Sequence, residues 1–508
     1  MSARVLVIGL DAAEATLLER WAEEGDLPAF ARLARDGGVA RLGNSLETLP
    51  GAIWPELTTG VSGGRTGLYY HPRQIHSGET ALRRVEPEDV DTSLYYWVRA
   101  SDAGKRVAVL DQPQTVPHSV LNGVMLTEWG LHDRNFAIAS EPPELLEEIR
   151  ARWGDHPVSS CDGHGGTREG YDWLLGALLA GAERKTDLLL ELLNREDWDL
   201  SVATFGETHC AGHQFWHFFD PAQPGHDPDA PDHLRLAVKT IYERVDQGVG
   251  ALLDAAGPET TVFVVASHGM GTYIGGYQLL SEFLVRIGLS SGKGTTAQVR
   301  SRLPVGVRTT VRKLVPGRVR TRVQERAGSL PRPLESPHTR AIDIPNNRCG
   351  GVRLNLRGRE PHGSIEPGAE ERAVLEEIRR ALYELEDPDS GERIIKEAIT
   401  AEEAFGENRH PDIPDLMVVF RTDLGQIVAA HSERVGLLRA DLFNPYTPRS
   451  GDHTVESRLW AVGPTVPAGA RLPEGNVLDL AATVLETLAV QLPDDLDGRP
   501  LAGLAPQA

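Results

Sequence analysis

Short apolar runs rich in β-branched residues recur along the chain, and polar or glycine-rich turns bound each of them. The clearest runs are Val5–Leu10, Val107–Leu110, Val124–Leu126, Leu200–Phe205, Val262–Ala266 and Leu416–Phe420. Their apolar residues are continuous rather than alternating, which is typical of parallel strands covered on both faces. Amphipathic, helix-like stretches lie between them, at Thr186–Asn194, Leu234–Ala255 and Glu370–Leu385. The pattern predicts an α/β fold with a mostly parallel sheet and helices on both of its faces.

One segment, residues 286–340, breaks this pattern. It holds 13 Lys or Arg residues against two acidic ones, Glu325 and Glu335, and includes the proline-rich piece Leu330–Pro337. One interpretation is an inserted, solvated helical arm, and the other is an electrostatic patch for an acidic partner, a membrane surface or a polyanionic substrate. We therefore expect a first part of the core at 1–285, a basic inserted arm at 286–340, and a second part of the core with a small subdomain at 341–508.

The overall charge restricts the partners. The 508 residues include 52 basic and 73 acidic side chains, a formal net charge of −21. This balance argues against binding a nucleic-acid polymer, because phosphate backbones favour clustered positive charge. It does not argue against a small anionic substrate held by local cations or metal ions.

The cysteines and the N-terminus bear on location. Cys161, Cys210 and Cys349 are far apart and odd in number, which favours a reducing compartment over a disulfide framework. The first apolar run ends after six residues at Asp11, too short for a signal peptide. No stretch approaches the roughly 18 apolar residues of a membrane helix. We expect a soluble, cytoplasmic protein with no membrane span.

Metal-ligand types of side chain gather where the predicted strands end. The candidates are Asp11, Glu207, His209, His213, Ser267, His268 and His453. Ligands of parallel sheets bind at the carboxyl ends of the strands, so these side chains are expected to converge. A single such residue is commonplace, and a lone histidine is more often structural, so the prediction depends on the coincidence of several.

These residue types suit a divalent ion. Imidazole and carboxylate groups bind Zn²⁺, Mn²⁺ or Fe, and we expect one or two ions per chain, with zinc favoured. Two ions about 3.5–4 Å apart would stabilise both the attacking and the leaving oxygen of a phosphoryl group. His209 and His213 are four residues apart, which places them on one face of a helix. The alternative is that one of them only packs beside Trp216 and Phe218.

Several stretches together carry a resemblance to a known family. They are VIGLDAAE; LPAFARLARDGGVARL followed by IWPELTTGVSGGRTG; VVASHGMG; SGDHTVESRLWAVGP; and GGVRLNLRGREPHGSIEPG with DPDSGERIIKEAITAEEAFGENRHPDIPDLMVVF. On these, the chain resembles the type I phosphodiesterase/nucleotide pyrophosphatase branch of the alkaline phosphatase superfamily. The last pair is the most specific, although it carries no catalysis. The resemblance covers most of the chain and implies an alkaline-phosphatase-like core with inserted cap or arm segments.

The resemblance also implies a hydrolase with two metal ions and a Thr or Ser nucleophile. Carried over by motif, Asp11 and His268 belong to the first ion, and His213 and His453 to the second. The chain departs from the family pattern at two ligand positions. Ser267 stands where an aspartate is expected, and His209 replaces the aspartate of the second site, which makes a three-histidine zinc site conceivable. Glu207 is a candidate to supply the lost carboxylate.

The nucleophile is a further departure. The family spacing leads to Pro50, which has no nucleophilic group. Thr48 is the candidate instead, at the start of an expected helix over Gly51–Leu57, where the positive helix end would favour a reacting hydroxyl. The alternative is that Thr48 is a plain N-cap residue. Two residues are candidates for substrate binding, Arg65 and Asn347.

Three functions remain open. The first is a metal-dependent hydrolase of a small-molecule phosphate ester, with a phosphodiester or nucleotide pyrophosphate ahead of a monoester. The second keeps the fold but has one metal ion and rewired chemistry on a phosphorylated or sulfated metabolite. The third is a non-catalytic binding protein that uses the segment 286–340. A homodimer is compatible with each.

Overall fold

The protein was analysed as a computed structural model that describes residues 3–69, 73–131, 134–161, 166–223, 225–291, 333–336, 338–344, 348–440 and 449–504. It divides into two units. Unit 1 comprises Met1–His71, Val85–Ile274 and Leu442–Ala508, and unit 2 comprises Pro72–Arg84 and Gly275–Asp441. The expected boundaries at 285 and 340 are not tested by this division, and most of the segment 286–340 lies outside the described residues.

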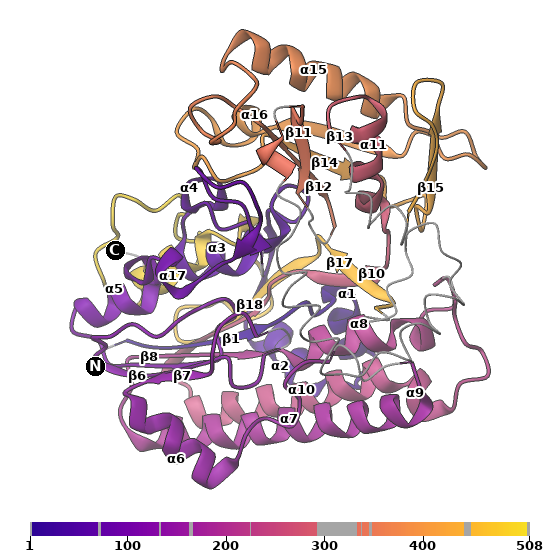
Figure 1. Ribbon diagram of the computed structural model, residues 1–508. Coiled ribbons are helices and arrows are strands. Elements are labelled where there is room, and N and C mark those ends of the chain that lie inside the picture. Colours follow the sequence, from indigo (N-terminus) through magenta and orange to yellow (C-terminus); the bar gives the residue numbers. More distant parts are fainter. Residues whose placement is uncertain are drawn as a thin grey trace. The chain divides into compact units, whose positions relative to one another are not determined.

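A ten-stranded sheet forms the centre of unit 1, in the order β19-β2-β18-β9-β1-β8-β5-β6-β7, with β20 beside β2 (Figure 1). Neighbours from β9 to β6 are parallel: β9 (Thr260–Ala266), β1 (Arg4–Leu10), β8 (Leu200–Phe205), β5 (Val107–Leu110) and β6 (Gly123–Thr127). Antiparallel pairings involve β18 (Ser457–Val462), β2 (Gly38–Gly43) and β7 (Ala139–Glu141). The short strands β19 (Ala470–Arg471) and β20 (Gly475–Asn476) complete it. The predicted mostly parallel sheet is confirmed.

Both faces of this sheet are covered by helices. In β1, Leu6, Ile8 and Leu10 belong to one hydrophobic core and Val5 and Val7 to the other, which explains the continuous apolar run. The first core includes residues of α1 (Ala15–Glu24), α2 (Pro28–Asp36), α6 (Pro143–Trp153), α7 (Arg168–Arg195), α8 (Glu207–Phe219) and α10 (Ala237–Ala256). The second includes residues of α3 (Ile53–Thr59), α5 (Tyr96–Asp102) and α17 (Asp479–Thr487).

Smaller elements complete unit 1. They are η1 (Pro50–Ala52), α4 (Gly63–Thr66), η2 (Pro87–Asp89), η3 (Thr92–Leu94), α9 (Asp232–Arg235) and the antiparallel ribbon of β10 (Gly269–Thr272) and β17 (Gly451–Thr454). Among the residues described, no helix combines the length and apolarity needed to cross a membrane.

Unit 2 is built on a four-stranded antiparallel sheet. Its order is β11 (Ala341–Ile344), β12 (Gly350–Leu354), β14 (Leu416–Phe420) and β13 (Ile395–Thr400). The other elements are β3 (Arg73–Gln74), β4 (Arg83–Arg84), η4 (Gly276–Leu279), α11 (Leu280–Arg286), η5 (Pro333–Glu335), α15 (Ala369–Tyr383), α16 (Ala401–Phe405), β15 (Ala429–Ser432) and β16 (Gly436–Arg439). The run Leu416–Phe420 is thus a strand, but its expected place in a parallel sheet is wrong. Its five residues are all buried, and burial rather than strand direction produces a continuous apolar run.

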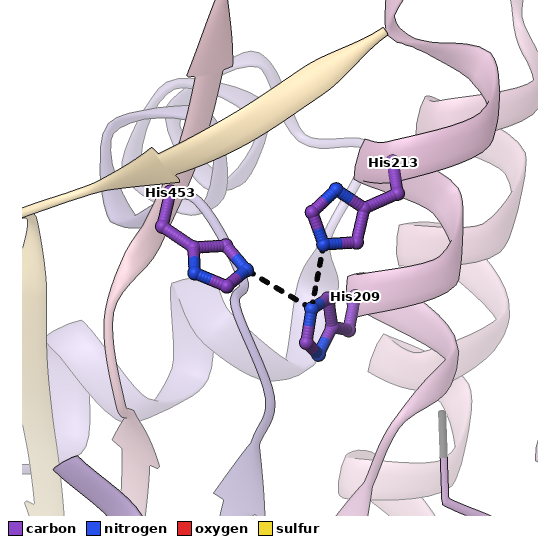
Figure 2. Close-up of side chains that lie close together, drawn as sticks. All are labelled: His209, His213 and His453. Carbon is purple, nitrogen blue, oxygen red and sulfur yellow. Dashed lines mark hydrogen bonds between the residues drawn. The ribbon is translucent and has the colours of Figure 1, made fainter. Parts of the chain in front are cut away.

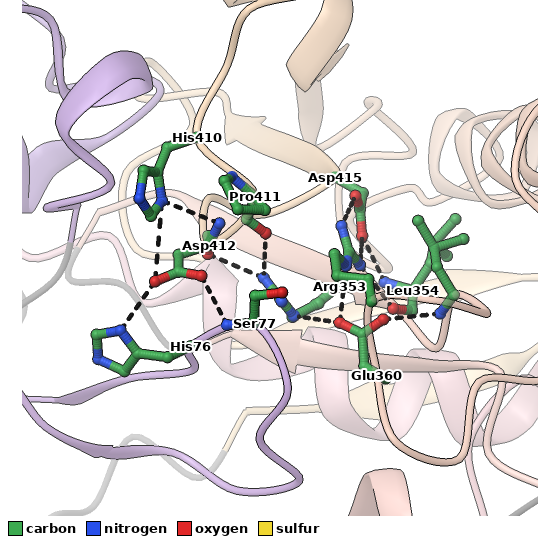
Figure 3. A network of polar contacts seen from close by, with 11 residues as sticks. His76, Ser77, Arg353, Leu354, Glu360, His410, Pro411, Asp412 and Asp415 are labelled. Carbon is green, nitrogen blue, oxygen red and sulfur yellow. Dashed lines mark hydrogen bonds and ion pairs between the residues drawn. The ribbon is translucent and has the colours of Figure 1, made fainter.

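The stretches most specific to the family resemblance form a buried polar network in unit 2 (Figure 3). Arg353 on β12 is fully buried, and its Nε lies 2.8 Å from Glu360 Oε1. Its Nη1 donates to the carbonyl oxygens of Pro411 and Asp412, both at 3.0 Å. Arg359 makes two 2.7 Å bonds to the Asp415 carboxylate. These charged residues therefore help to maintain the fold of unit 2.

Candidate metal centre

Three histidines from two elements of unit 1 converge (Figure 2). His209 and His213 lie one turn apart on α8, which begins two residues after β8 ends, and His453 lies on β17. His209 Nε2 is 2.9 Å from His213 Nε2 and 3.0 Å from His453 Nε2. Each histidine offers a ring nitrogen, and these nitrogens all lie within 4.8 Å of one another. The predicted convergence of these three residues is present in the structure.

Hydrogen bonds on the far side of two rings orient them. His213 Nδ1 lies 2.8 Å from the carbonyl oxygen of Gly451, and His209 Nδ1 lies 2.6 Å from Asp11 Oδ2. Carbonyl and carboxylate oxygens accept, so each Nδ1 carries the proton and each Nε2 presents a lone pair to the cluster. Metal-binding histidines are held in this way by carbonyls and carboxylates. Three neutral imidazoles form a suitable zinc donor set that leaves a fourth position for water or substrate.

Asp11 lies at the end of β1 with both carboxylate oxygens engaged. Besides the bond from His209, Trp54 Nε1 on α3 donates to Asp11 Oδ1 at 2.7 Å. Gly9 leaves room for this indole, since a Cβ there would lie 2.8 Å from the Trp54 ring. Burial alone would raise the pKa of the Asp11 carboxyl, but electrostatic attraction to His209 and His268 and the hydrogen bonds from His209 and Trp54 hold it well below its usual range. Asp11, an expected metal ligand, therefore binds the His209 ring on the side that faces away from the triad.

His268 borders the cluster. Its ring centroid is 4.4 Å from that of His453 and 6.1 Å from that of His209. Its Nδ1 lies 3.0 Å from Ser267 Oγ, and the fully buried Ser267 hydroxyl also lies 3.3 Å from the Leu10 carbonyl. Over the described ranges, the histidine triad is the one group of three or more metal-type side chains that meets the distance limits of an ion site. Asp11, Ser267 and His268 form no second such group there.

Glu207 lies two residues before His209 on α8, so the two side chains leave the helix on different sides and contact different residues. Its Oε1 is 3.0 Å from His156 Nε2 and 3.8 Å from Lys185 Nζ, and all three side chains are buried. Burial would raise the pKa of the Glu207 carboxyl, but the charge of Lys185 and the His156 hydrogen bond lower it. Lys185 also lies 3.3 Å from Asp111 Oδ2 at the end of β5. Glu207 therefore belongs to a buried ion cluster beside the histidines.

Sequence reasoning did not single out Lys185, Asp111, His156 or Trp54. Lys185 did have a detectable signal. It falls on the buried face of α7, in step with Leu178, Ala182, Leu188, Leu189 and Leu192. A lysine at core spacing in a helix indicates a buried partner of opposite charge.

Thr48 lies in the turn before η1 and is half-buried. Its Oγ1 lies 3.2 Å from the carbonyl oxygen of Ser45, to which it donates. The expected helix over Gly51–Leu57 is instead η1 followed by α3, whose N-cap is Ala52 and has no side-chain cap. Thr48 is therefore not the N-cap of this helix, and its role as nucleophile stays a prediction.

The two substrate-binding candidates have different outcomes. Arg65 Nη1 lies 2.7 Å from Asp497 Oδ1 and 2.9 Å from the Asp495 carbonyl. It also lines a cavity of about 210 Å³ in unit 1, together with Thr59, Tyr95 and Gln114. No histidine is among the described residues that line this cavity. Asn347 lies outside the described residues.

The fold and this centre together define a class: an α/β protein with a candidate metal site at the carboxyl edge of its sheet. The model of the type I phosphodiesterase/nucleotide pyrophosphatase family matches residues 5–426. The chain therefore belongs to this family, which is part of the alkaline phosphatase superfamily. His453 lies beyond the matched residues. No curated protein matches the chain.

Proposed function

We propose that the protein is a metal-dependent hydrolase of small-molecule phosphate esters, of the phosphodiester or nucleotide pyrophosphate type. The observation that carries the proposal is the convergence of His209, His213 and His453, with two of the rings oriented by acceptors on their Nδ1 atoms. Family membership supplies the reaction class, because the family is one of phosphodiesterases.

One ion per chain fits this donor set best, and zinc fits it better than manganese or iron, because three imidazoles form a zinc site. A divalent ion supplies Lewis acidity that polarises a phosphoryl group and activates water. In this proposal Asp11 does not bind the ion. It keeps the proton on His209 Nδ1 and balances charge on that ring, while Trp54 holds the carboxylate in place.

The attacking group in this proposal is water rather than Thr48, whose hydroxyl donates back to Ser45. In this proposal His268, which borders the triad, hydrogen-bonds the substrate. Arg65 is proposed to contact a part of the substrate away from the reacting phosphorus. Ser267, which is fully buried, would hold His268 through Nδ1.

The first test combines metal analysis with hydrolysis of a chromogenic phosphodiester. Wild-type protein purified without a histidine tag or chelators should contain about one zinc per chain by elemental mass spectrometry. His213→Ala and His453→Ala should lose the ion and reduce turnover to the background rate without unfolding. His233→Ala is the matched control, since His233 is exposed and pairs with Asp172. Retained turnover in both triad variants would exclude the proposal. Two ions per chain would instead indicate a two-metal site in which Asp11 or Glu207 binds the second ion.

A second candidate function is supported by Ser267 and Pro50, which replace a ligand and the nucleophile of the family pattern. Here the same single ion acts on a phosphorylated or sulfated metabolite in a different reaction. Turnover of a sulfate monoester or a phosphate monoester, with none of the diester, would favour it. A protein that takes up no metal ion on reconstitution would favour a non-catalytic binding role instead.

A further inference from the structure

We infer that Glu14 is a positioning residue of the metal centre, because its carboxylate fastens the β10–β17 ribbon to the carboxyl end of β1. The ribbon carries His453 and directly follows His268. The inference rests on the proposed function, because it concerns how the proposed metal ligands are held.

The contacts of Glu14 divide evenly between two tasks. Oε1 accepts hydrogen bonds from the Thr16 backbone N–H at 3.3 Å and the Thr16 hydroxyl at 2.7 Å, which caps α1. Oε2 accepts from the Met270 backbone N–H at 3.0 Å and from Thr454 Oγ1 at 2.7 Å. A helix cap needs only the first pair. The second pair joins Glu14 to Met270 on β10 and Thr454 on β17, which lie 256 and 440 residues further along the chain.

The ribbon has little freedom to shift at this contact. A Cβ on Gly269 would lie 2.1 Å from Glu14 Oε2 and 2.1 Å from Thr454 Oγ1, so only glycine leaves room for the carboxylate. A Cβ on Gly451, at the other end of β17, would lie 2.4 Å from the Gly212 carbonyl oxygen on α8. The ribbon is therefore packed closely against Glu14 at the start of α1 and against α8.

The groups that Glu14 holds are the neighbours of His453. Met270 is the cross-strand partner of His453, and Thr454 is the next residue along β17 and pairs with Gly269. Glu14 is buried and does not contact the triad. It thus sets the position of His453 relative to His209 and His213, which lie on a different element. Loss of the ribbon contacts should weaken metal binding rather than abolish folding.

Two threonine variants separate these tasks. Thr454→Val removes a ribbon contact and leaves the α1 cap, whereas Thr16→Val removes a cap contact and leaves the ribbon. Both remove one hydroxyl bond to the same carboxylate, so Thr16→Val is the matched control. Zinc affinity is measured by competition with a chromophoric chelator, and thermal unfolding of the metal-free proteins reports structural damage.

We expect Thr454→Val to bind zinc about 10-fold more weakly, the lower end of the loss seen when a direct hydrogen-bond partner of a metal ligand is removed. Thr454→Ser, which keeps the hydroxyl, should bind zinc as the wild type does. Thr16→Val should also bind zinc as the wild type does. The isosteric Glu14→Gln should lose zinc affinity to the same extent as Thr454→Val. Equal affinity of Thr454→Val, Glu14→Gln and wild type would overturn the inference and leave the proposed function standing. A wild-type protein that binds no zinc would overturn both.

Discussion

At the scale of single residues, the buried carboxylates of unit 1 show how neighbours decide the state of a side chain. Burial raises the pKa of any carboxyl, because the charged form loses its water. Attraction to His209 and His268 and the hydrogen bonds of His209 and Trp54 reverse this for Asp11, and the charge of Lys185 with the His156 hydrogen bond reverses it for Glu207, so that both pKa values lie below their usual range. Among the described residues Glu56 has no cationic partner, and burial raises its pKa to about 7. It accepts hydrogen bonds from the Gly63 N–H and the Ser45 hydroxyl, at 2.9 and 2.7 Å.

Glu56 should make stability depend on pH. Its folded pKa of about 7 exceeds the ordinary value of 4.5, so the folded state binds this proton more tightly than the unfolded state. Its contribution to stability is fully present below about pH 4.5 and is lost as the pH rises through about 7. Glu56→Gln stays neutral at every pH. Between pH 5 and 8, the variant should therefore gain about 2–3 kcal/mol relative to wild type, measured by urea unfolding. A stability difference that does not change with pH would contradict this assignment.

At the scale of elements, the strands were the most predictable part. The predicted bounds of β5, β8 and β14 match the structure, because each is a short buried run ended by polar residues. Which sheet a strand joins was harder to predict, as β14 shows, since β14 of the antiparallel sheet is as completely buried as β8 of the parallel one. The triad was predictable because two of its histidines follow a strand directly. Trp54 and Glu14 were not, because their partners are separated from them by many residues and only the fold brings them together. Lys185 carried a signal in its core spacing on α7, but the identity of its buried partners could not be predicted from the sequence.

The Lys185 cluster joins several of these elements. Lys185 on α7 donates to the carbonyl oxygens of Gly130 and Thr204, both at 2.9 Å, and pairs with Asp111 and Glu207. Two glycines make room for the side chains of this cluster. A Cβ on Gly130 would lie 3.0 Å from Lys185 Cε, and a Cβ on Gly181 would lie 2.3 Å from His156 Nε2. The cluster thereby fixes the first turn of α8, on which His209 lies.

Lys185→Met should be strongly destabilising. Removing the cation leaves Asp111 and Glu207 as buried anions with less compensation, and breaking a buried pair this way costs about 3–5 kcal/mol. The free energy of unfolding in urea measures the loss. Lys396→Met on β13 serves as the control, because Lys396 is exposed and its replacement should change stability by less than about 1 kcal/mol. Similar effects of the two substitutions would show that the buried cluster contributes no more than a surface charge.

At the scale of the whole molecule, the candidate metal centre and the fluorescent tryptophans lie in the same unit. The described structure places the histidine triad, Asp11, Glu14 and the Lys185 cluster all within unit 1. All nine tryptophans of the chain also belong to it, at positions 21, 54, 97, 129, 153, 173, 198, 216 and 460. Unit 2 has none, so tryptophan fluorescence follows the unfolding of the unit that holds the candidate metal centre.

This coincidence makes metal binding visible in a melting experiment. A ligand that binds only the folded state stabilises it by about 2.7 kcal/mol when its free concentration is 100 times its dissociation constant. Zinc at that excess should therefore raise the fluorescence-detected unfolding midpoint of the wild type. His213→Ala should melt at the same temperature with and without zinc, whereas His233→Ala should respond as the wild type does. If the wild-type midpoint did not move although one zinc per chain was bound, the ion would lie outside the triad, because binding there must stabilise the fold that assembles its three ligands.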